Sequence, residues 1–287
     1  MATRYPELFV SPRWLADRLD GSVGIVDASW YLPQMGRDPK EEFRNAHVPG
    51  AVHFDIDAFV DGTSHLPHTL ADPATFSRMA GELGLSDDRP IVVYDGIGLF
   101  SAPRVWWNLS RYGARDVRIL EGGFPAWMAA DLPVETGDAR PRPARFDSRR
   151  DEKGIATLTD VRTAVEERSP IADARPLERF AGKAPEPREG MRSGHMPGAR
   201  CLPFTDVQEK GHLLPPDRLE AAFRSAGLDP ASPIIATCGS GVTAATLILA
   251  QTALGYGAES RLYDGSWSEW GGRNDTPVEA GTGDEVR

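Results

Sequence analysis

Short apolar runs alternate with longer amphipathic stretches along the whole chain. Residues 23–26 and 91–94 are near-continuous apolar runs of strand length, which is typical of strands buried on both faces. Ser11-Pro12 places an N-cap residue before a proline at the first helical position, and the stretch over 217–226 predicts another helix. This alternation indicates βα units, so we predict an α/β fold with mostly parallel sheets flanked by helices.

The chain also repeats itself. Four segments of the first half recur in the same order in the second half, at offsets between 143 and 148 residues. Such a repeat predicts tandem copies of one domain. The paired segments are 25–29 with 171–175, 47–51 with 195–199, 91–96 with 234–239, and 121–127 with 264–270.

A stretch without apolar periodicity separates the copies. Residues 133–153 contain three prolines and several arginines, which is typical of an exposed linker. We therefore predict an N-terminal domain over residues 1–145 and a C-terminal domain over residues 146–287.

Composition and charge narrow the function classes. The 287 residues carry 42 acidic and 32 basic side chains, and a net charge of −10 repels nucleic acid and anionic membranes. An anionic substrate would have to be met by locally placed arginines. Two cysteines, Cys201 and Cys238, are too few for a disulfide framework. Because no apolar leader or membrane-length run occurs, we expect a cytoplasmic protein that contacts neither nucleic acid nor membrane.

The duplication serves as an internal control, since features kept in both halves indicate scaffold and features of one half indicate chemistry. His47 and His195 stand in the same His-x-Pro-Gly-Ala turn, which predicts a structural role for both. After the strand predicted over 234–237 the second half has Cys238, where the first half has Asp95. Only the second half can therefore use sulfur chemistry.

Cys238 follows a strand at the edge where parallel α/β sheets bind ligands. A long apolar helix is predicted from about Thr243 to Leu254. Gly239 and Gly241 allow the loop to curl so that its N–H groups converge on one sulfur atom, and the helix dipole adds to their field. This environment favours the thiolate, so we expect Cys238 to be reactive. The alternative is a buried thiol beside an ordinary glycine turn.

At this point the chain resembles a known family. The loop 238–244, the tandem halves and the segment 263–270 closely resemble the rhodanese superfamily, and within it the 3-mercaptopyruvate sulfurtransferases, over nearly the whole chain. The resemblance implies two tandem rhodanese-like domains, of which the C-terminal one is catalytic. It also implies that the cysteine takes a sulfane sulfur from a donor, becomes a persulfide and passes the sulfur to an acceptor. Further segments that resemble the family are 27–33, 36–38, 101–107 and 185–188.

The loop sequence bears on the donor. Thiosulfate-using relatives carry Arg-Lys after the cysteine, whereas this chain has Gly239-Ser240, which favours the monoanion 3-mercaptopyruvate over the dianion thiosulfate. Thiosulfate remains the alternative. The resemblance implies that Arg179 and Arg188 hold the donor's carboxylate and ketone. It also implies that the amides of Gly239, Gly241, Val242 and Thr243 cradle the sulfur, and Thr243 is a candidate helix cap.

The resemblance implies helpers for the cysteine as well. Ser240 would relay a proton or stabilise the sulfur, assisted by Asp57 and His68 from the first half. Asp57 matches the family pattern, but the residues around His68 depart from it, and His65 lies close enough to leave the choice of histidine open.

Other classes fit less well. A phosphatase loop would need arginine where Ala244 stands, and Gly96-Ile97-Gly98 is too short for a dinucleotide fingerprint. The spacing of His47, His53, His65 and His68 matches no ordinary zinc motif, so we expect neither metal nor cofactor.

The class of function and the sulfur acceptor each have alternatives. A non-catalytic sulfur-relay or binding module is the alternative from another class, although retention of Cys238 argues against it. The acceptor could be cyanide, a small thiol, thioredoxin or another protein. Cys201 is expected to be a core strand thiol, with a resolving role as the alternative.

Overall fold

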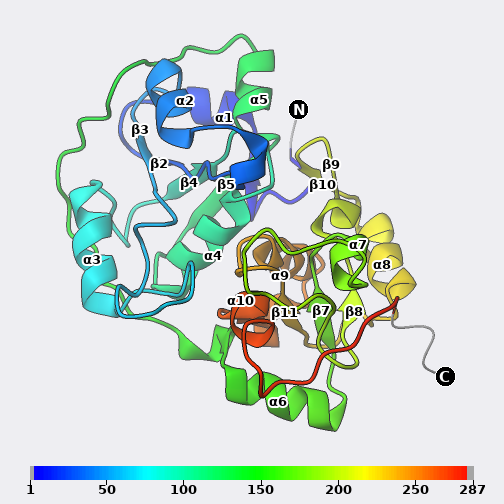
Figure 1. The fold of residues 1–287 in the computed structure, drawn as a ribbon. Coiled ribbons are helices and arrows are strands. Elements are labelled where there is room, and N and C mark those ends of the chain that lie inside the picture. Colours follow the sequence, from blue (N-terminus) through cyan, green and yellow to red (C-terminus); the bar gives the residue numbers. More distant parts are fainter. Residues whose placement is uncertain (1–2, 283–287) are drawn as a thin grey trace. The chain divides into compact units, whose positions relative to one another are not determined.

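The computed structural model describes residues 3–282 (Figure 1). Its contacts group these residues into two compact units. The first unit holds residues 3–62, 70–151 and 210–212, and the second holds residues 63–69, 152–209 and 213–282. The short segment 63–69 therefore belongs structurally with the second half of the chain, although it lies in the first half of the sequence.

The first unit is built on a five-stranded parallel sheet of order β1-β5-β4-β2-β3. Its central strands, β4 and β2, are fully buried, as their apolar runs predict. The strands are β1 (Phe9–Val10), β2 (Gly24–Asp27), β3 (Ala51–His53), β4 (Ile91–Tyr94) and β5 (Val117–Leu120). The helices are α1 (Pro12–Ala16), η1 (Pro33–Met35), α2 (Pro39–Asn45), α3 (Pro73–Glu82), α4 (Ala102–Arg111) and α5 (Gly123–Ala129).

The second unit repeats this plan with a five-stranded parallel sheet of order β6-β12-β11-β7-β8. The strands are β6 (Ile155–Ala156), β7 (Ile171–Asp173), β8 (Arg200–Cys201), β11 (Ile235–Thr237) and β12 (Arg261–Tyr263). The helices are η2 (Glu152–Gly154), α6 (Leu158–Glu167), α7 (Leu177–Phe180), η3 (Phe204–Val207), α8 (Pro216–Ser225), α9 (Ala244–Ala253), η4 (Gly257–Glu259) and α10 (Ser266–Trp270). A separate two-stranded sheet pairs β9 (Gln208–Glu209) with β10 (His212–Leu213).

Each unit packs its own core around its sheet, so each copy buries the apolar faces of its own helices. The first core includes Leu15, Phe43 and Trp127, and the second includes Phe180, Trp267 and Trp270. The α/β fold of two repeated parallel sheets that the sequence predicts is thereby confirmed.

Local signals predict several element ends within a residue. Ser11 caps α1, because its hydroxyl accepts the N–H of Trp14 at 3.2 Å. Helix α8 ends at Ser225, and Gly227 has a φ of 75°, the left-handed conformation that commonly stops a helix.

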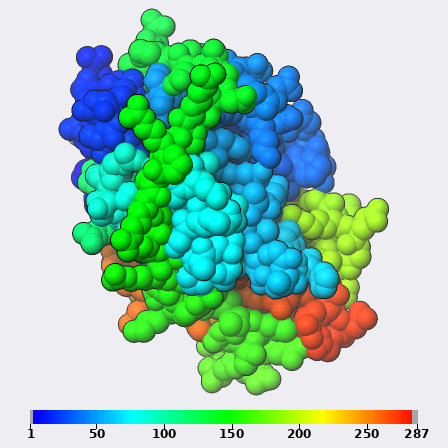
Figure 2. Space-filling model, turned by 90° about the vertical axis from the view of Figure 1, so that its left-hand side faces the viewer, coloured from blue at the N-terminus to red at the C-terminus, as the bar shows by residue number. Residues whose placement is uncertain are grey.

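The segment after α5 is more attached than an exposed linker would be. Most of residues 133–143 are exposed, but the N–H of Ala144 donates to the carbonyl of Gly81 at 2.9 Å, and Phe146 is 3% exposed with its ring edge against Phe76. Figure 2 shows this bright-green segment lying along the cyan α3. Composition missed the anchor because one buried aromatic side chain creates no periodic pattern.

Among the residues that the structure describes, no helix is both long and apolar enough to cross a membrane.

Candidate active site

Cys238 directly follows β11, the middle strand of the second sheet. Its side chain is 2% exposed. Helix α9 begins at Ala244, so the loop 238–243 connects the centre of the sheet to the start of a buried helix. Thr243 stands at the N-cap position, but its hydroxyl makes no capping hydrogen bond, so the expectation that its side chain caps α9 is wrong.

The amides of this loop are well suited to an anion. Gly241 has a φ of 80°, a left-handed conformation that turns the chain back on itself. Within residues 3–282, the N–H groups of Ser240, Thr243 and Ala244 find no backbone or side-chain acceptor. Amides at a helix start that have no partner inside the helix present positive charge to a bound anion. This arrangement is compatible with an anion on Cys238, and the cradling of its sulfur by the loop amides stays a prediction.

The first unit holds an anion in the equivalent loop. Asp95 occupies the position of Cys238 after β4 and is 1% exposed. Five main-chain amides converge on its carboxylate at distances between 2.5 and 2.9 Å. The donors are Ile97, Gly98, Phe100, Ser101 and Ala102.

Ser240 is paired with a histidine from the segment 63–69. The Nδ1 atom of His68 lies 2.9 Å from the hydroxyl oxygen of Ser240, and the two residues are 3% and 4% exposed. His68 has a φ of 62°, a conformation that is strained for a residue with a side chain and is often found at functional sites. His65 is exposed. The structure thus brings His68, and not His65, to the serine.

Asp57 belongs to the first unit. It is exposed, and its carboxylate accepts the indole N–H of Trp30 at 3.0 Å. Its role as a helper of Ser240 stays a prediction.

Buried ion pairs hold Arg179 in place. The carboxylate of Glu186, whose side chain is 3% exposed, binds both Arg179 and Arg175, the latter at 2.7 Å. Arg175 also pairs with Asp173 at 2.6 Å and lies 4.3 Å from the centre of the Trp267 ring. Burial opposes the charge on Arg175, but Asp173 and Glu186 outweigh this effect and raise the pKa of its guanidinium. These partners form an electrically neutral set of two cations and two carboxylates.

The guanidinium of Arg179 lies against the loop 238–243, called the cysteine loop below. A Cβ atom placed on Gly239 would come within 3.0 Å of Nη2 of Arg179. The absence of a side chain at Gly239, the residue that follows Cys238, therefore leaves room for the guanidinium of Arg179. Arg188, the second predicted substrate ligand, is half-buried in a bend of the loop after α7.

Sequence reasoning missed Arg175, Glu186, Ser266 and Ser268. Arg175 differs between the repeats, since Ser29 stands at its position in the first half, so the duplication could have identified it. Glu186 lies beyond the repeated segments and offered no such signal. Ser266 and Ser268 contact the cysteine loop through its backbone: the Ser266 hydroxyl accepts the N–H of Cys238 at 3.3 Å.

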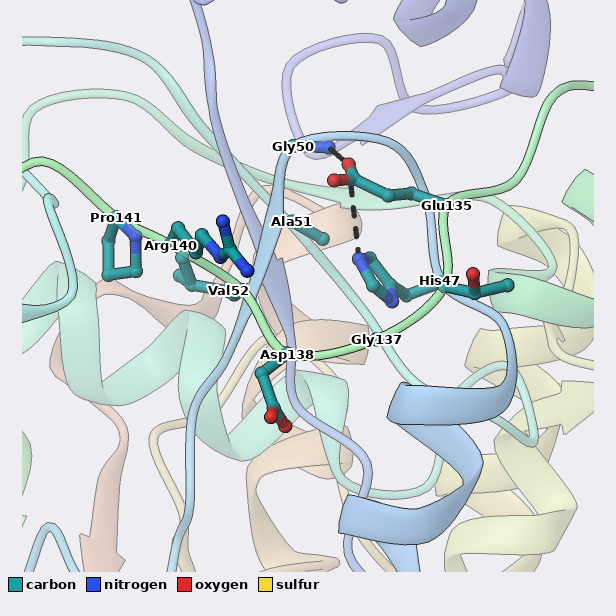
Figure 3. Close-up of a pocket in the computed structure, with 11 residues that line it drawn as sticks. His47, Gly50, Ala51, Val52, Glu135, Gly137, Asp138, Arg140 and Pro141 are labelled. Carbon is teal, nitrogen blue, oxygen red and sulfur yellow. Dashed lines mark hydrogen bonds and ion pairs between the residues drawn. The ribbon is translucent and has the colours of Figure 1, made fainter.

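Two residues have contacts that argue for structural roles. His47 donates from Nδ1 to the carbonyl of Phe43 at 2.7 Å, and His195 makes the matching bond to Phe180 at 2.9 Å. In Figure 3 a dashed line joins the His47 ring to the Glu135 carboxylate, 4.0 Å away, and both residues line a cavity of about 380 Å³.

Cys201 is half-buried in β8, and desolvation raises the pKa of its thiol to about 12. A thiol of this kind stays protonated at neutral pH, which disfavours the resolving role.

Comparison with known proteins identifies the family. The rhodanese-like domain model matches residues 11–130 and 143–273. The 3-mercaptopyruvate sulfurtransferase of Escherichia coli (strain K12) is 44% identical over 274 residues, which cover 94% of this chain and 97% of that protein. A thiosulfate sulfurtransferase of Cricetulus griseus is 40% identical over 271 residues, 91% of each chain.

A solved structure supports the same family assignment. The crystal structure of SseA from Escherichia coli, described as a 3-mercaptopyruvate sulfotransferase, aligns with a TM-score of 0.83 and 41% identity, covering 90% of this chain and 98% of that one. The chain therefore belongs to the rhodanese family, and its two units carry rhodanese-like domains in tandem.

Proposed function

We propose that this chain is a 3-mercaptopyruvate sulfurtransferase. In the first half-reaction the Cys238 thiolate attacks the donor's sulfur atom, an S–S bond forms and the donor's C–S bond breaks. The electron pair of that bond passes into the enolate of pyruvate, which takes up a proton and leaves as pyruvate. In the second half-reaction an acceptor nucleophile attacks the outer sulfur and regenerates the thiolate.

The observation that carries this proposal is the pair of equivalent loops. The loop around Asp95 directs five amides at one anion, and the loop around Cys238 has the same position in its sheet, with amides that lack acceptors among the described residues. A persulfide is an anion near neutral pH, so the second loop can stabilise both states of the sulfur carrier.

Ser240 and His68 supply a route for the proton. The serine hydroxyl lies two residues after Cys238, and its bond to His68 Nδ1 links it to an imidazole, a group that can both accept and donate a proton. We assign Ser240 as the group that delivers a proton to the pyruvate enolate and His68 as its partner. Asp57 remains a candidate helper for this pair.

The electrostatics around Arg179 favour a monoanionic donor. Glu186 already neutralises part of the Arg179 charge, and Gly239-Ser240 adds none, so the loop lacks the surplus that a dianion such as thiosulfate would need. Arg179 and Arg188 would bind the carboxylate and ketone of 3-mercaptopyruvate. The relatives include both named activities at similar identity, so this charge balance, and not the degree of identity, favours one donor.

The acceptor is proposed by chemistry alone. A thiol, such as a small thiol or thioredoxin, or cyanide can take the outer sulfur of a persulfide. We propose a reducing, cytoplasmic setting for this reaction, because thiol acceptors stay reduced there.

Intact-mass measurement after incubation with 3-mercaptopyruvate tests the proposal. We expect a gain of one sulfur atom on the protein together with release of pyruvate. Cys238→Ser should gain nothing, whereas the matched control Cys201→Ser should behave like the unmodified chain. Turnover that survives in Cys238→Ser would contradict the assignment. Donor choice is read separately from kcat/KM, and equal values for thiosulfate and 3-mercaptopyruvate would refute the donor argument alone.

A further inference from the structure

Residues at the start of α10 donate hydrogen bonds to two carbonyl groups of the cysteine loop. The carbonyl of Cys238 accepts the N–H of Trp267 at 3.0 Å. The carbonyl of Gly239 accepts two donors from Ser268, its N–H at 2.9 Å and its hydroxyl at 2.7 Å. Ser268 is 7% exposed, so these bonds compete little with water.

A fixed carbonyl also fixes the amide that follows it. In a planar trans peptide the C=O of one residue and the N–H of the next point in opposite directions. With the Gly239 carbonyl directed at Ser268, the N–H of Ser240 is directed away from α10. In the first unit the equivalent N–H, that of Ile97, donates to the Asp95 carboxylate at 2.8 Å.

The first unit supports the equivalent carbonyl differently. The carbonyl of Gly96, which corresponds to Gly239, accepts Nη2 of Arg37 at 3.5 Å, a long bond from a different element. Phe124 donates its N–H to the carbonyl of Asp95 at 3.0 Å, as Trp267 does to Cys238, but Pro125 stands at the position of Ser268 and offers neither a hydroxyl nor an N–H. A charged carboxylate orients its own amides, because hydrogen bonds to an ionised oxygen are strong. Sulfur is a weaker acceptor, so the second loop gains more from an external anchor.

We propose that Ser268 is a positioning residue for Cys238: its hydroxyl locks the Gly239 peptide so that the Ser240 amide stays aimed at the sulfur anion. The inference rests on the proposed function of Cys238 as the sulfur carrier. It assigns to a residue outside the cysteine loop the task that the anion itself performs around Asp95.

The test compares threonine and valine at position 268, which have the same shape and differ in the hydroxyl, and adds alanine, which lacks the hydroxyl and is smaller. Ser268→Thr keeps the hydroxyl, Ser268→Val replaces it with a methyl group, and Ser268→Ala removes it. The rate of Cys238 alkylation by iodoacetamide is measured against pH by intact mass, which requires no turnover. We expect the Val and Ala variants to react about 3- to 10-fold more slowly at pH 7, with the midpoint of the pH profile displaced upward. The Thr variant should follow the unmodified chain.

Ser232→Ala, which removes an exposed serine bond to Asp229, is the control for a general effect of losing a serine. Thermal unfolding of each variant separates lost folding from lost positioning. Coincident pH profiles for the Thr and Val variants would overturn the inference, and so would a Cys238 thiol that iodoacetamide never modifies. A chain that alkylates as expected but gains no sulfur from 3-mercaptopyruvate would instead refute the proposed function and leave the positioning role standing.

Discussion

The loops at Asp95 and Cys238 place different side chains in one backbone setting. In the first loop the anion is a carboxylate that accepts five amides and is permanently satisfied. In the second loop a cysteine stands at this position, and the amides of Ser240, Thr243 and Ala244 have no acceptor among the described residues. With the function proposed for Cys238, one fold uses the same helix-start geometry for stability in one copy and for reactivity in the other.

The largest expected effect comes from making the second loop like the first. Cys238→Asp places a carboxylate among the free amides and removes the nucleophile. We expect kcat to fall more than about 10³-fold, because the covalent step is lost. We also expect the free energy of unfolding to rise by about 1–2 kcal/mol from charge-assisted hydrogen bonds. Steady-state assays and denaturant titration measure the two effects.

Cys238→Asn is the matched control for that substitution, since it has the shape of aspartate without the charge. It should lose activity equally and gain no stability. If the Asn and Asp variants unfold at the same denaturant concentration, the second loop is not an anion cradle of the kind seen at Asp95.

His68 has no equivalent bond in the first loop, where Ile97 stands at the position of Ser240. We expect His68→Ala to lower kcat for 3-mercaptopyruvate by about 10²-fold, a usual contribution for a proton-transfer group. His65→Ala, which changes an exposed histidine of the same segment, should be near normal. Equal losses in both variants would assign the effect to the segment as a whole and remove His68 from the proton route.

Glu186 forms ion pairs with Arg175 and Arg179 in the second unit. Glu186→Gln removes the carboxylate that orients Arg179 and leaves Arg175 with Asp173 as its remaining carboxylate among the partners described. We expect KM for 3-mercaptopyruvate to rise about 10-fold, equivalent to roughly 1.4 kcal/mol of binding. The discrimination against thiosulfate should shrink as net positive charge returns. Glu178→Gln, on an exposed part of α7, is the control, and an unchanged KM in Glu186→Gln would show that Arg179 needs no such partner.

The smallest effect on activity, and a clear one on stability, is expected at the aspartates that end β2 and β7. Asp173 is paired with Arg175, but Asp27 has Ser29 as its neighbour, and burial raises the pKa of Asp27 to about 6. A raised folded-state pKa means that the folded chain binds more protons between about pH 4 and pH 6. Stability therefore falls as pH rises through this window, by up to about 3 kcal/mol.

Asp27→Asn should remove that pH dependence and increase stability at pH 7 to 8, while leaving kcat unchanged. Asp173→Asn should instead destabilise, because it takes a carboxylate from a buried arginine. Urea titrations at pH 4, 6 and 8 measure both. An Asp27→Asn variant that keeps the same slope with pH would exclude Asp27 as its origin.

Much of the fold could be predicted from the sequence because its signals are local or repeated. The runs over 91–94 and 235–237 are buried strands, Ser11 caps α1, and the segments that recur between the halves occupy matching places in the two sheets. The difference between Asp95 and Cys238 needed no structure to be noticed.

The rest depended on distances that local patterns do not encode. The bond between His68 and Ser240 joins residues 172 positions apart, and residues 63–69 pack with the half of the molecule to which they do not belong in sequence. Glu186 reaches Arg175 across a loop with no hydrophobic period to define its path. Ser268 acts through a main-chain carbonyl, and backbone acceptors leave no trace in residue identity.

The small exposed area of Cys238 restricts which molecules can react with its sulfur. With only 2% of the side chain accessible, a bulky electrophile cannot align with the sulfur, whereas a slender molecule with the reactive atom at its tip can. In a persulfide the outer sulfur lies one S–S bond beyond Sγ. An acceptor that approaches along that bond therefore meets the transferable sulfur before it meets the cysteine.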